Sequence, residues 1–470
     1  MLLNDANEAL LRDIKAIVGD IGMRPPSHDD LHEPRGLVVG RAAATVRPSN
    51  TTEVSAVLKL CHAARVGVVP LGGGTGLTGA RSLVDGALPI LLSLDRMKTI
   101  RRKDADAQSL TVEAGAILQN VQDVAADMGL LFPLSLASEG SAQIGGVLST
   151  NAGGVNVLRY GNARDLCLGL EVVLADGRIW HGLSGLHKDN TGYDFRHLMI
   201  GAEGTLGVIT AAVLRLFAQP TQRLAAWIAV DSPKAALALL GRMKAALGDV
   251  ISAYELIDRT GLEFLGEAGV MALPDGLPVS AWVVLMECGA GPGEDLGARI
   301  EAALGAAFEA GLCQDALMSQ SEAQRARFWQ MRERIPEANR AIGAVSSHDI
   351  ALPLAAIPAF IDAARGAIDP VLRLNCFGHL GDGNLHFNIF PPQGKKGRDY
   401  RAHADAVKRT VYDLVAAHGG SFSAEHGIGR LKLDELRRYG DPVKLEMMRA
   451  VKAALDPAGI LNPGALVPEG

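Results

Sequence analysis

The chain has 470 residues, of which 48% are hydrophobic and 21% charged, and its formal net charge is -6. This length is well beyond the size at which one hydrophobic core stops growing, so two or three domains are expected. The composition is that of a globular enzyme and excludes a disordered chain, while the lack of a basic patch argues against nucleic-acid binding.

The N-terminal residues predict an amphipathic surface helix, because Asp5, Glu8 and Asp13 lie among leucines. These acidic residues contradict the basic-then-apolar order of a signal peptide. The longest apolar runs, such as 281–286, are far too short to cross a bilayer, so no transmembrane segment is expected. Five scattered cysteines without a Cys-x-x-Cys pair indicate neither a disulfide framework nor a zinc ribbon, and a cytoplasmic location is therefore expected.

From about residue 40, helical and strand patterns alternate along the chain. Residues 51–64 predict a helix and residues 66–70 a short strand, and further strands are predicted at 90–94, 110–112, 169–174 and 208–216. The glycine-rich part of the sequence ends near residue 219. Beyond it, predicted helices alternate with strands such as 227–230 and 281–287. A domain boundary is expected there. A last helix starts at residue 445 and should stop at Asp456-Pro457, because proline removes a backbone donor and restricts the residue before it.

The first glycine-rich segment, 71–79, follows a strand and contains a literal G-x-G-x-x-G pattern. A Rossmann loop must open an uninterrupted helix, and Gly86 and Pro89 do not allow one over 80–89. Such a loop can still direct successive N–H groups at an anion, because glycine tolerates positive φ and has no Cβ. Two more glycine-rich stretches, 140–154 and 201–207, together predict an elongated ligand, although each alone would equally suit a tight turn.

The segment from about residue 47 to 216, which contains these loops, resembles the FAD-binding domain of vanillyl-alcohol-oxidase-type flavoproteins. The resemblance implies a PCMH-type fold and noncovalent FAD, since the first loop has no histidine of the kind that some members bond to the cofactor. It also implies which positions line FAD. They are Pro70, Gly72, Gly73, Gly74, Thr75, Gly76, Leu77, Gly140, Ser141, Ile144, Gly145, Gly146, Ser149, Asn151, Gly153, Gly154, Glu203, Gly207, Ile209 and, in the second half, Asn384.

The sharpest local signal is the segment 377–388, Phe-Gly-His-Leu-Gly-Asp-Gly-Asn-Leu-His-Phe-Asn. Its glycines cannot continue a helix and predict a turn between two strands, so that His379 and His386 lie on adjacent strands and converge. Asn388 follows His386 at the strand period of two and points to the same face.

A second cluster, Ser-Ala-Glu-His-Gly-Ile-Gly at 423–429, supplies Glu425 and His426. Two imidazoles and one carboxylate suit a divalent metal with open positions, and both zinc and manganese accept these ligands. The alternative is that some of the 12 histidines are ordinary hydrogen-bonding surface groups.

Together with Asp-Pro-Ala-Gly-Ile-Leu-Asn-Pro-Gly at 456–464, these motifs make the chain resemble the D-2-hydroxyglutarate and D-lactate dehydrogenase branch of that flavoprotein family, from about residue 36 to 467. The resemblance implies an α+β chain. The FAD-binding domain would span 36–217. An α+β cap or substrate domain with an antiparallel sheet would span 218–467, with 421–467 returning to the flavin domain.

The resemblance also assigns roles: His379, His386 and Glu425 as metal ligands, Asn388 as a substrate contact, His426 as a catalytic base that touches substrate, and Arg332 as the carboxylate-gripping residue. A guanidinium fork suits a carboxylate, although without the resemblance a solvated salt bridge would explain Arg332 equally well. The chain departs from the hydroxyglutarate pattern at Pro336, usually threonine, and at Ser347, usually lysine. These changes remove two groups that could bind a second, distal carboxylate.

The expected function is FAD- and metal-dependent oxidation of a small D-2-hydroxy acid, such as D-2-hydroxyglutarate or D-lactate, to the 2-oxo acid. The hydride would pass to flavin N5 and the proton to His426. By resemblance, an electron-transfer flavoprotein or a quinone would accept the electrons, and the resemblance allows a homodimer. Two alternatives stay open: an oxygen-using FAD oxidase, such as a glycolate-oxidase-like subunit, and a noncatalytic subunit of a complex.

Overall fold

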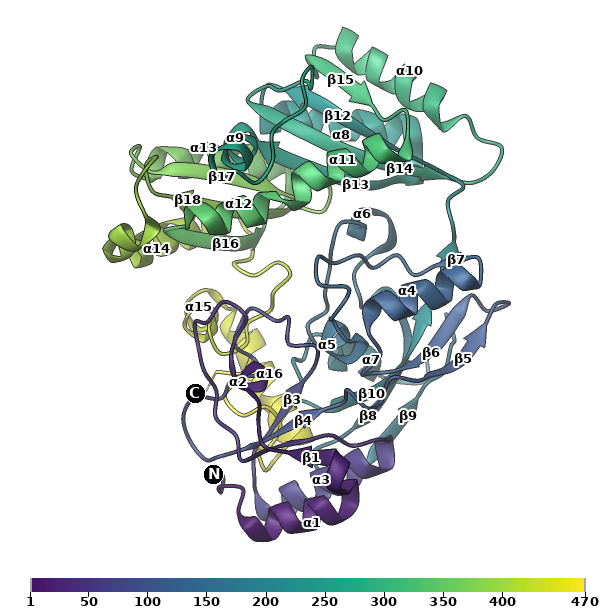
Figure 1. The fold of residues 1–470 in the computed structure, drawn as a ribbon, viewed down its shortest axis with the longest axis vertical. Helices are drawn as coiled ribbons and strands as arrows, with labels where there is room; N and C mark the ends of the chain where they lie inside the picture. The colour runs from purple at the N-terminus through teal and green to yellow at the C-terminus, as the bar shows by residue number, and fades with distance from the viewer. Residues whose placement is uncertain (1, 469–470) are drawn as a thin grey trace. The chain divides into compact units, whose positions relative to one another are not determined.

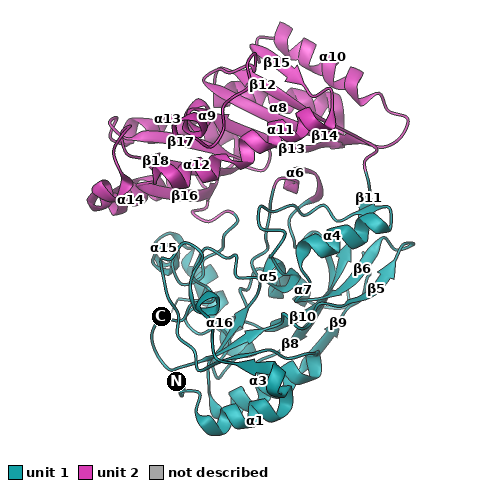
Figure 2. Cartoon of the chain, in the orientation of Figure 1, with its two compact units in different colours: residues 1–154, 161–219, 425–470 teal, residues 155–160, 220–424 magenta. Residues whose placement is uncertain are grey.

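The structure, a computed structural model, describes residues 2–468 and divides into two compact units (Figure 2). Unit 1 comprises Met1–Gly154, Gly161–Gln219 and Glu425–Gly470, and unit 2 comprises Val155–Tyr160 and Pro220–Ala424. The C-terminal segment therefore belongs to the unit that contains the glycine-rich loops. None of the described helices combines the length and the hydropathy that a membrane-spanning helix needs.

Unit 1 holds two larger sheets and a small one (Figure 1). The first has the strand order β1-β2-β4-β3, in which β4 lies parallel to both β2 and β3. The second is antiparallel, in the order β5-β6-β10-β8-β9, and β11 pairs with β7 in the third. The strands are β1 (Met23–Arg24), β2 (Ala44–Val46), β3 (Val68–Leu71), β4 (Ile90–Ser93), β5 (Ile100–Asp104), β6 (Ser109–Glu113), β7 (Leu130–Leu131), β8 (Cys167–Val173), β9 (Ile179–Gly182), β10 (Val208–Arg215) and β11 (Phe217–Ala218).

Several helices of unit 1, α3 among them, begin at a side chain that caps their first turn. The Asn50 side chain accepts a hydrogen bond from Glu53 N at the start of α3, and Arg65 ends that helix in the left-handed conformation at φ 54°. The predicted helix 51–64 is confirmed. The helices are α1 (Glu8–Val18), α2 (His28–Leu31), α3 (Thr51–Ala64), α4 (Leu118–Asp127), α5 (Ile144–Ser149), α7 (Phe195–Met199), α15 (Leu433–Tyr439) and α16 (Pro442–Leu455).

The chain passes from β3 to the neighbouring parallel strand β4 without forming a helix. The residues between Leu71 and Ile90 are turns, bends and irregular loop. This confirms that the first glycine loop is not the opening of a Rossmann helix. Its backbone amides are consequently not consumed by helical hydrogen bonds.

Unit 2 is built on one seven-stranded antiparallel sheet in the order β15-β12-β14-β13-β17-β18-β16 (Figure 1). The predicted antiparallel sheet is confirmed. Its strands are β12 (Gln222–Val230), β13 (Ile251–Asp258), β14 (Trp282–Ala290), β15 (Asp315–Met318), β16 (Ser346–Ala351), β17 (Arg373–Gly378) and β18 (Asn384–Phe390). Its helices are α6 (Val157–Tyr160), α8 (Pro233–Leu247), α9 (Arg259–Glu267), α10 (Leu296–Glu309), α11 (Glu322–Glu333), α12 (Ile335–Ile342), α13 (Ile357–Ala367) and α14 (Arg401–Ala417).

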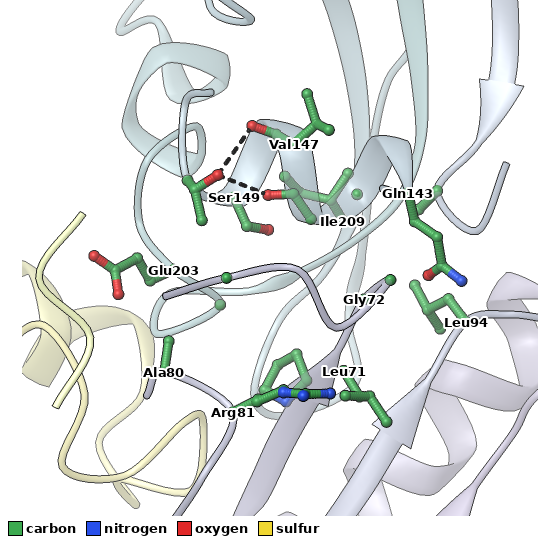
Figure 3. A pocket seen from close by; sticks show the side chains of 18 of the residues that line it. Leu71, Gly72, Ala80, Arg81, Leu94, Gln143, Val147, Ser149, Glu203 and Ile209 are labelled. Atoms are coloured by element: carbon green, nitrogen blue, oxygen red, sulfur yellow. Dashed lines mark hydrogen bonds between the residues drawn. The ribbon is translucent and has the colours of Figure 1, made fainter. Parts of the chain in front are cut away.

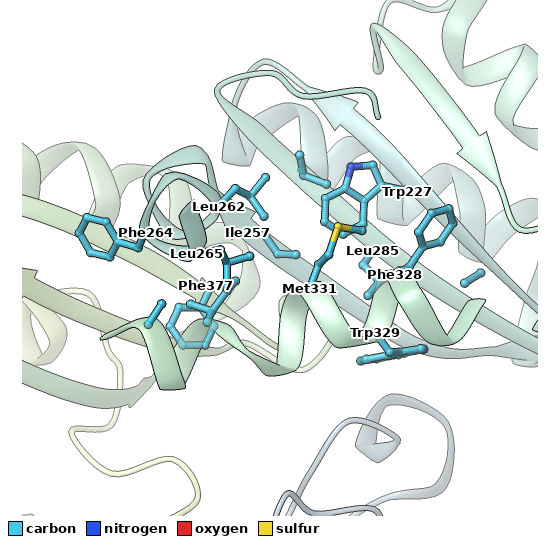
Figure 4. Close-up of a cluster of buried hydrophobic side chains, with 14 of the residues drawn as sticks. Trp227, Ile257, Leu262, Phe264, Leu265, Leu285, Phe328, Trp329, Met331 and Phe377 are labelled. Atoms are coloured by element: carbon cyan, nitrogen blue, oxygen red, sulfur yellow. The ribbon is translucent and has the colours of Figure 1, made fainter. Parts of the chain in front are cut away.

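A continuous apolar cluster lies beneath α11 in unit 2 (Figure 4). Phe328 and Met331 of α11 are almost fully buried against the sheet, where Trp227 of β12 and Leu285 of β14 are inaccessible to solvent. Full burial of such side chains contributes about 1.5–3 kcal/mol each. The packing fixes the rotation of α11 and therefore the direction in which its next residue, Arg332, projects.

The hairpin between β17 and β18 carries the two candidate metal-binding histidines. His386 lies in β18 opposite Phe377, and the turn 380–383 joins the strands, as predicted. His379 differs slightly from the prediction, because it follows the last residue of β17 instead of lying within that strand. The cause is Gly378, whose φ of 151° and close approach to the Asn384 carbonyl end the regular pairing.

The C-terminal helix α16 ends at Leu455, confirming the predicted stop, and the buried Asp456 organises the turn that follows. Its carboxylate accepts hydrogen bonds from Ile460 N at 3.1 Å and Leu461 N at 2.8 Å, and from the Lys452 ammonium at 2.6 Å. The same ammonium donates to the Thr205 carbonyl at 2.8 Å. The end of the chain is thus joined to the third glycine-rich loop.

We expect Asp456→Ala to lower the stability of unit 1 by about 3 kcal/mol, because it leaves a partly buried ammonium without its carboxylate. The matched control is Asp441→Ala, which removes the N-cap of the same helix, where Asp441 accepts from Lys444 N. That change should cost only about 1 kcal/mol. Thermal unfolding followed by circular dichroism compares the two variants, and equal losses would contradict the importance of the Asp456 turn.

Candidate active site

Two of the glycine-rich loops predicted to bind a common ligand touch each other in unit 1. A Cβ added to Gly73 would lie 2.0 Å from the Ser141 carbonyl oxygen, and one added to Gly72 would lie 3.4 Å from the Cα of Gly146. Backbone atoms cannot yield as a flexible side chain does. Glycine at position 73 is therefore required by the close approach of the two loops.

These loops and the third one line a pocket in unit 1 (Figure 3). Of the positions predicted to contact FAD, twelve belong to its lining: Pro70, Gly72, Gly73, Gly74, Thr75, Gly76, Gly145, Gly146, Ser149, Glu203, Gly207 and Ile209. The lining combines glycines, whose amides no Cβ shields, with apolar residues such as Leu92 and Leu136. Such a lining suits a ligand with a phosphate portion and an apolar ring. The residues present therefore fit a flavin dinucleotide.

Other positions predicted to contact FAD are placed outside this lining: Leu77, Gly140, Ser141, Ile144, Asn151, Gly153, Gly154 and Asn384. Several of them shape the loops. Asn151 has a φ of 51° and accepts a hydrogen bond from Arg164 N, while the backbone at Gly154 runs against the Ser135 carbonyl, 2.1 Å from where a Cβ would lie. Asn384 lies in unit 2, where its amide nitrogen donates to Asp349 at 2.9 Å.

Glu203 connects the flavin pocket to the segment that follows Glu425 and His426. Its two carboxylate oxygens accept from Ile428 N at 2.8 Å and Gly429 N at 2.7 Å, and its own φ is 51°. Burial raises the pKa of this carboxyl, against the opposing effect of the two amides. Glu203 therefore shapes the pocket and also fixes the chain just beyond the second predicted cluster.

Arg81, which the sequence analysis did not single out, is the one cationic side chain among the described residues that line the pocket. It donates to the Asp29 carbonyl at 2.8 Å and to the His32 carbonyl, and its Nε has no hydrogen-bond partner among the described residues. Burial lowers its pKa, although nearby carboxylates oppose this shift. Its position beside Gly74, 2.7 Å from where a Cβ would lie, allows it to face a phosphate.

The predicted metal ligands converge. Ligand atoms of His379, His386 and Glu425 all lie within 4.8 Å of one another. Glu425 directly follows Ala424, whose N–H donates to the carbonyl of Asp349, the residue of β16 that lies opposite His386. His426 is the next residue and is partly buried in the same bend. Two imidazoles and a carboxylate at this spacing form a donor set that fits zinc or manganese.

Glu255 of β13 joins the histidine pair to Arg332, and the sequence analysis missed it. Its Oε1 lies 2.5 Å from His379 Nδ1, and its Oε2 accepts from Arg332 Nε at 2.7 Å. Burial by itself would raise the pKa of Glu255, but His379 and Arg332 outweigh it and lower the pKa to about 2. Glu255 lies in a wholly buried strand that reads as structural, so its spacing in the sequence offered no signal.

Arg332 is buried in α11 and is not the solvated surface residue that would have been the alternative. Its guanidinium carbon lies 4.7 Å from the centre of the Phe377 ring, and that ring lies 5.0 Å from the His386 ring. Cation–π contact and the ion pair to Glu255 hold the side chain in one place. The structure thus brings Arg332 together with both histidines.

Cross-strand register places two further predicted positions on the face that carries His386. Asn388 lies opposite Ser347 of β16, and its Oδ1 accepts from His348 N at 3.3 Å. Ser347 is exposed, and side chains that are directly opposite share one face of a sheet.

Pro336 lies in the first turn of α12, where its missing N–H costs nothing.

Comparison with known proteins identifies the fold and the family of the chain. Residues 42–182 match the family described as "FAD binding domain", and residues 219–466 match "FAD linked oxidases, C-terminal domain". The p-cresol methylhydroxylase structure with bound substrate superposes with a TM-score of 0.75, covering 99% of this chain and 98% of that one at 15% identity. The fold is therefore the predicted one, that of vanillyl-alcohol-oxidase-type flavoproteins, and the two family matches make FAD the cofactor.

Two curated relatives narrow the class. The chain is 37% identical over 426 residues to the D-2-hydroxyglutarate dehydrogenase of Xanthomonas citri pv. viticola, covering 90% of this chain and 89% of that protein. It is 36% identical over 441 residues to the probable mitochondrial D-2-hydroxyglutarate dehydrogenase of Oryza sativa subsp. indica, covering 92% and 77%. The chain belongs to the FAD-dependent D-2-hydroxyacid dehydrogenases, which confirms the predicted resemblance.

We expect Gly73→Ala to weaken FAD binding about five- to 150-fold, because a clash with backbone costs about 1–3 kcal/mol. Gly140→Ala is the control, since its Cβ would meet nothing within 4 Å. The flavin-to-protein absorbance ratio and titration of the apoprotein with FAD measure the effect. Normal FAD binding by Gly73→Ala would show that the two loops do not need their close approach.

Proposed function

We propose that this enzyme oxidises D-2-hydroxyglutarate or a closely similar small D-2-hydroxy acid to the 2-oxo acid, and that the reaction uses a divalent metal ion as well as FAD. The observation that carries the proposal is the convergence of His379, His386 and Glu425 within 4.8 Å of one another, next to the buried Arg332. The substrates named for the curated relatives support the choice of acid.

When bound, FAD supplies the hydride acceptor, and a zinc or manganese ion at the three ligands would lower the pKa of a hydroxyl close to it. The residues of the chain provide the rest of the chemistry. A metal site made from three protein ligands leaves coordination positions for the substrate. His426, adjacent to Glu425, is proposed as the base that accepts the hydroxyl proton.

Arg332 is proposed to bind the carboxylate next to the reacting carbon. Its hydrogen bond to Glu255 uses Nε and leaves the terminal Nη groups for other acceptors. A guanidinium whose direction is already fixed loses little entropy when an acid binds, which improves orientation of the substrate. Asn388, on the face that carries His386, is proposed as a further polar contact.

The electrons are proposed to leave for an electron-transfer flavoprotein or a quinone. Turnover with an artificial dye compared with turnover in oxygen tests whether the enzyme is a dehydrogenase or an oxidase. Faster reoxidation by oxygen, with stoichiometric peroxide, would instead support the oxidase alternative.

We expect His386→Ala to abolish dye reduction and to lower the bound zinc or manganese, while the yellow flavin spectrum is unchanged, because His386 lies outside the flavin pocket lining. His403→Ala, on the exposed face of α14, is the control and should match the wild type. Dye-coupled assays and metal analysis of dialysed protein provide the measurements. Full activity of His386→Ala would remove the metal from the mechanism.

We expect Ser347→Lys to lower the KM for D-2-hydroxyglutarate about 1.4- to fivefold, since an exposed ion pair with the distal carboxylate contributes about 0.2–1 kcal/mol. D-Lactate has no second carboxylate and serves as the control substrate, whose KM should not change. Steady-state kinetics with both acids measure the difference. An equal effect on both acids would place the distal carboxylate elsewhere.

A further inference from the structure

A carboxyl side chain in the middle of a buried strand needs a reason. Every residue of β13 from Ile251 to Asp258 is buried, and Glu255 has no exposed surface. Moving a carboxylate out of water costs several kcal/mol unless good partners surround it, and apolar residues of similar size are often at least as stable. Fold stability alone therefore does not explain a glutamate here.

Both partners of Glu255 belong to the proposed chemistry. His379, 124 positions later in the chain, reaches one carboxylate oxygen, and Arg332, 77 positions later, reaches the other. Since Arg332 Nε donates to one oxygen and His379 Nδ1 lies 2.5 Å from the other, Nδ1 is the ring nitrogen that bonds to this carboxylate. The other ring nitrogen, Nε2, is then the one with a lone pair to give a metal.

Arg332 gains its direction from the same carboxylate. The ion pair neutralises a guanidinium whose side chain is only 7% exposed, and the Phe377 ring supports the flat face of that guanidinium. Since Glu255 holds Nε, the end of the fork faces away from it. Without Glu255, the cation would be buried with one fewer partner and its direction would no longer be fixed.

We infer that Glu255 is a positioning residue shared by the metal site and the substrate-carboxylate site: through its two oxygens it fixes the ligand tautomer of His379 and the direction of Arg332. This inference rests on the proposed function of the same site. It makes metal affinity and acid affinity depend together on one side chain that touches neither metal nor substrate.

Glu287 of β14 provides a matched comparison. It is also a buried glutamate on the neighbouring strand, and it also accepts hydrogen bonds from α11, from Arg325 Nη1 at 2.6 Å and from Trp329 Nε1. Neither donor is a proposed ligand or substrate contact. Replacing Glu287 with glutamine thus removes one ion pair between α11 and the sheet, but leaves the apolar packing of α11 and the His379–Glu255–Arg332 contacts in place.

The test compares Glu255→Gln, Glu287→Gln and His386→Ala in the full-length, FAD-loaded enzyme. A glutamine at 255 must present one amide N–H where an acceptor is needed, so it cannot serve both donors. We expect Glu255→Gln to retain FAD, to bind zinc or manganese about 10–100-fold more weakly in a chelator competition, and to show a raised KM for D-2-hydroxyglutarate even at saturating metal. Glu287→Gln should show neither change.

The outcomes separate the inference from the proposed function. Metal binding and KM in Glu255→Gln equal to those in Glu287→Gln, while His386→Ala loses both metal and turnover, would overturn the role of Glu255 alone. Retained metal and turnover in His386→Ala would overturn the proposed function instead.

A measurement on the unaltered protein covers the case in which Glu255→Gln does not fold. In zinc-loaded enzyme with ¹⁵N-labelled histidine, the resonances lost in His379→Gln identify His379. We expect a proton coupled to Nδ1 and none coupled to Nε2. The opposite tautomer would contradict the inference.

Discussion

A carboxylate taken out of water must find donors, and this constraint explains how the candidate site is held together. Three buried carboxylates do this at different places: Glu255 in the sheet of unit 2, and Glu203 and Asp456 in unit 1. Each accepts hydrogen bonds from another part of the chain. Because a buried carboxylate is unfavourable without these bonds, they also hold the donating segment in one position. Glu203 and Asp456 use mainly backbone amides, whereas Glu255 uses two side chains that carry proposed chemistry.

The rigid parts of the fold were readable from the sequence because their causes are local. The helix from Thr51 to Ala64 has an asparagine cap and a helical apolar period, and the strands of unit 1 follow short apolar runs bounded by glycine. The failure of the Rossmann pattern was also local, since proline and glycine after the first loop forbid the required helix. Steric rules within a few residues decide all of these features.

The site could be predicted from the sequence only in part, because contacts between residues far apart in the chain leave no pattern in the residue spacing. His379, His386 and Glu425 were found because two of them flank a turn and the third lies in a second polar cluster. Glu255 and Arg81 were missed, since one looks like a core-strand residue and the other like a surface arginine. Only tertiary contact reveals that each faces a proposed site.

The distribution of unit 1 along the chain sets an order in which its parts become available during synthesis. The amides that satisfy Glu203, at residues 428 and 429, and the pocket-lining Asn462 are made only after all of unit 2 has been translated. Domains made early on the ribosome ordinarily fold first, but here the N-terminal portion lacks these partners until the last tenth of the chain emerges. A nascent chain stalled before residue 428 would carry Glu203 without the two amides that donate to it, so the flavin pocket is completed only after unit 2 has been synthesised.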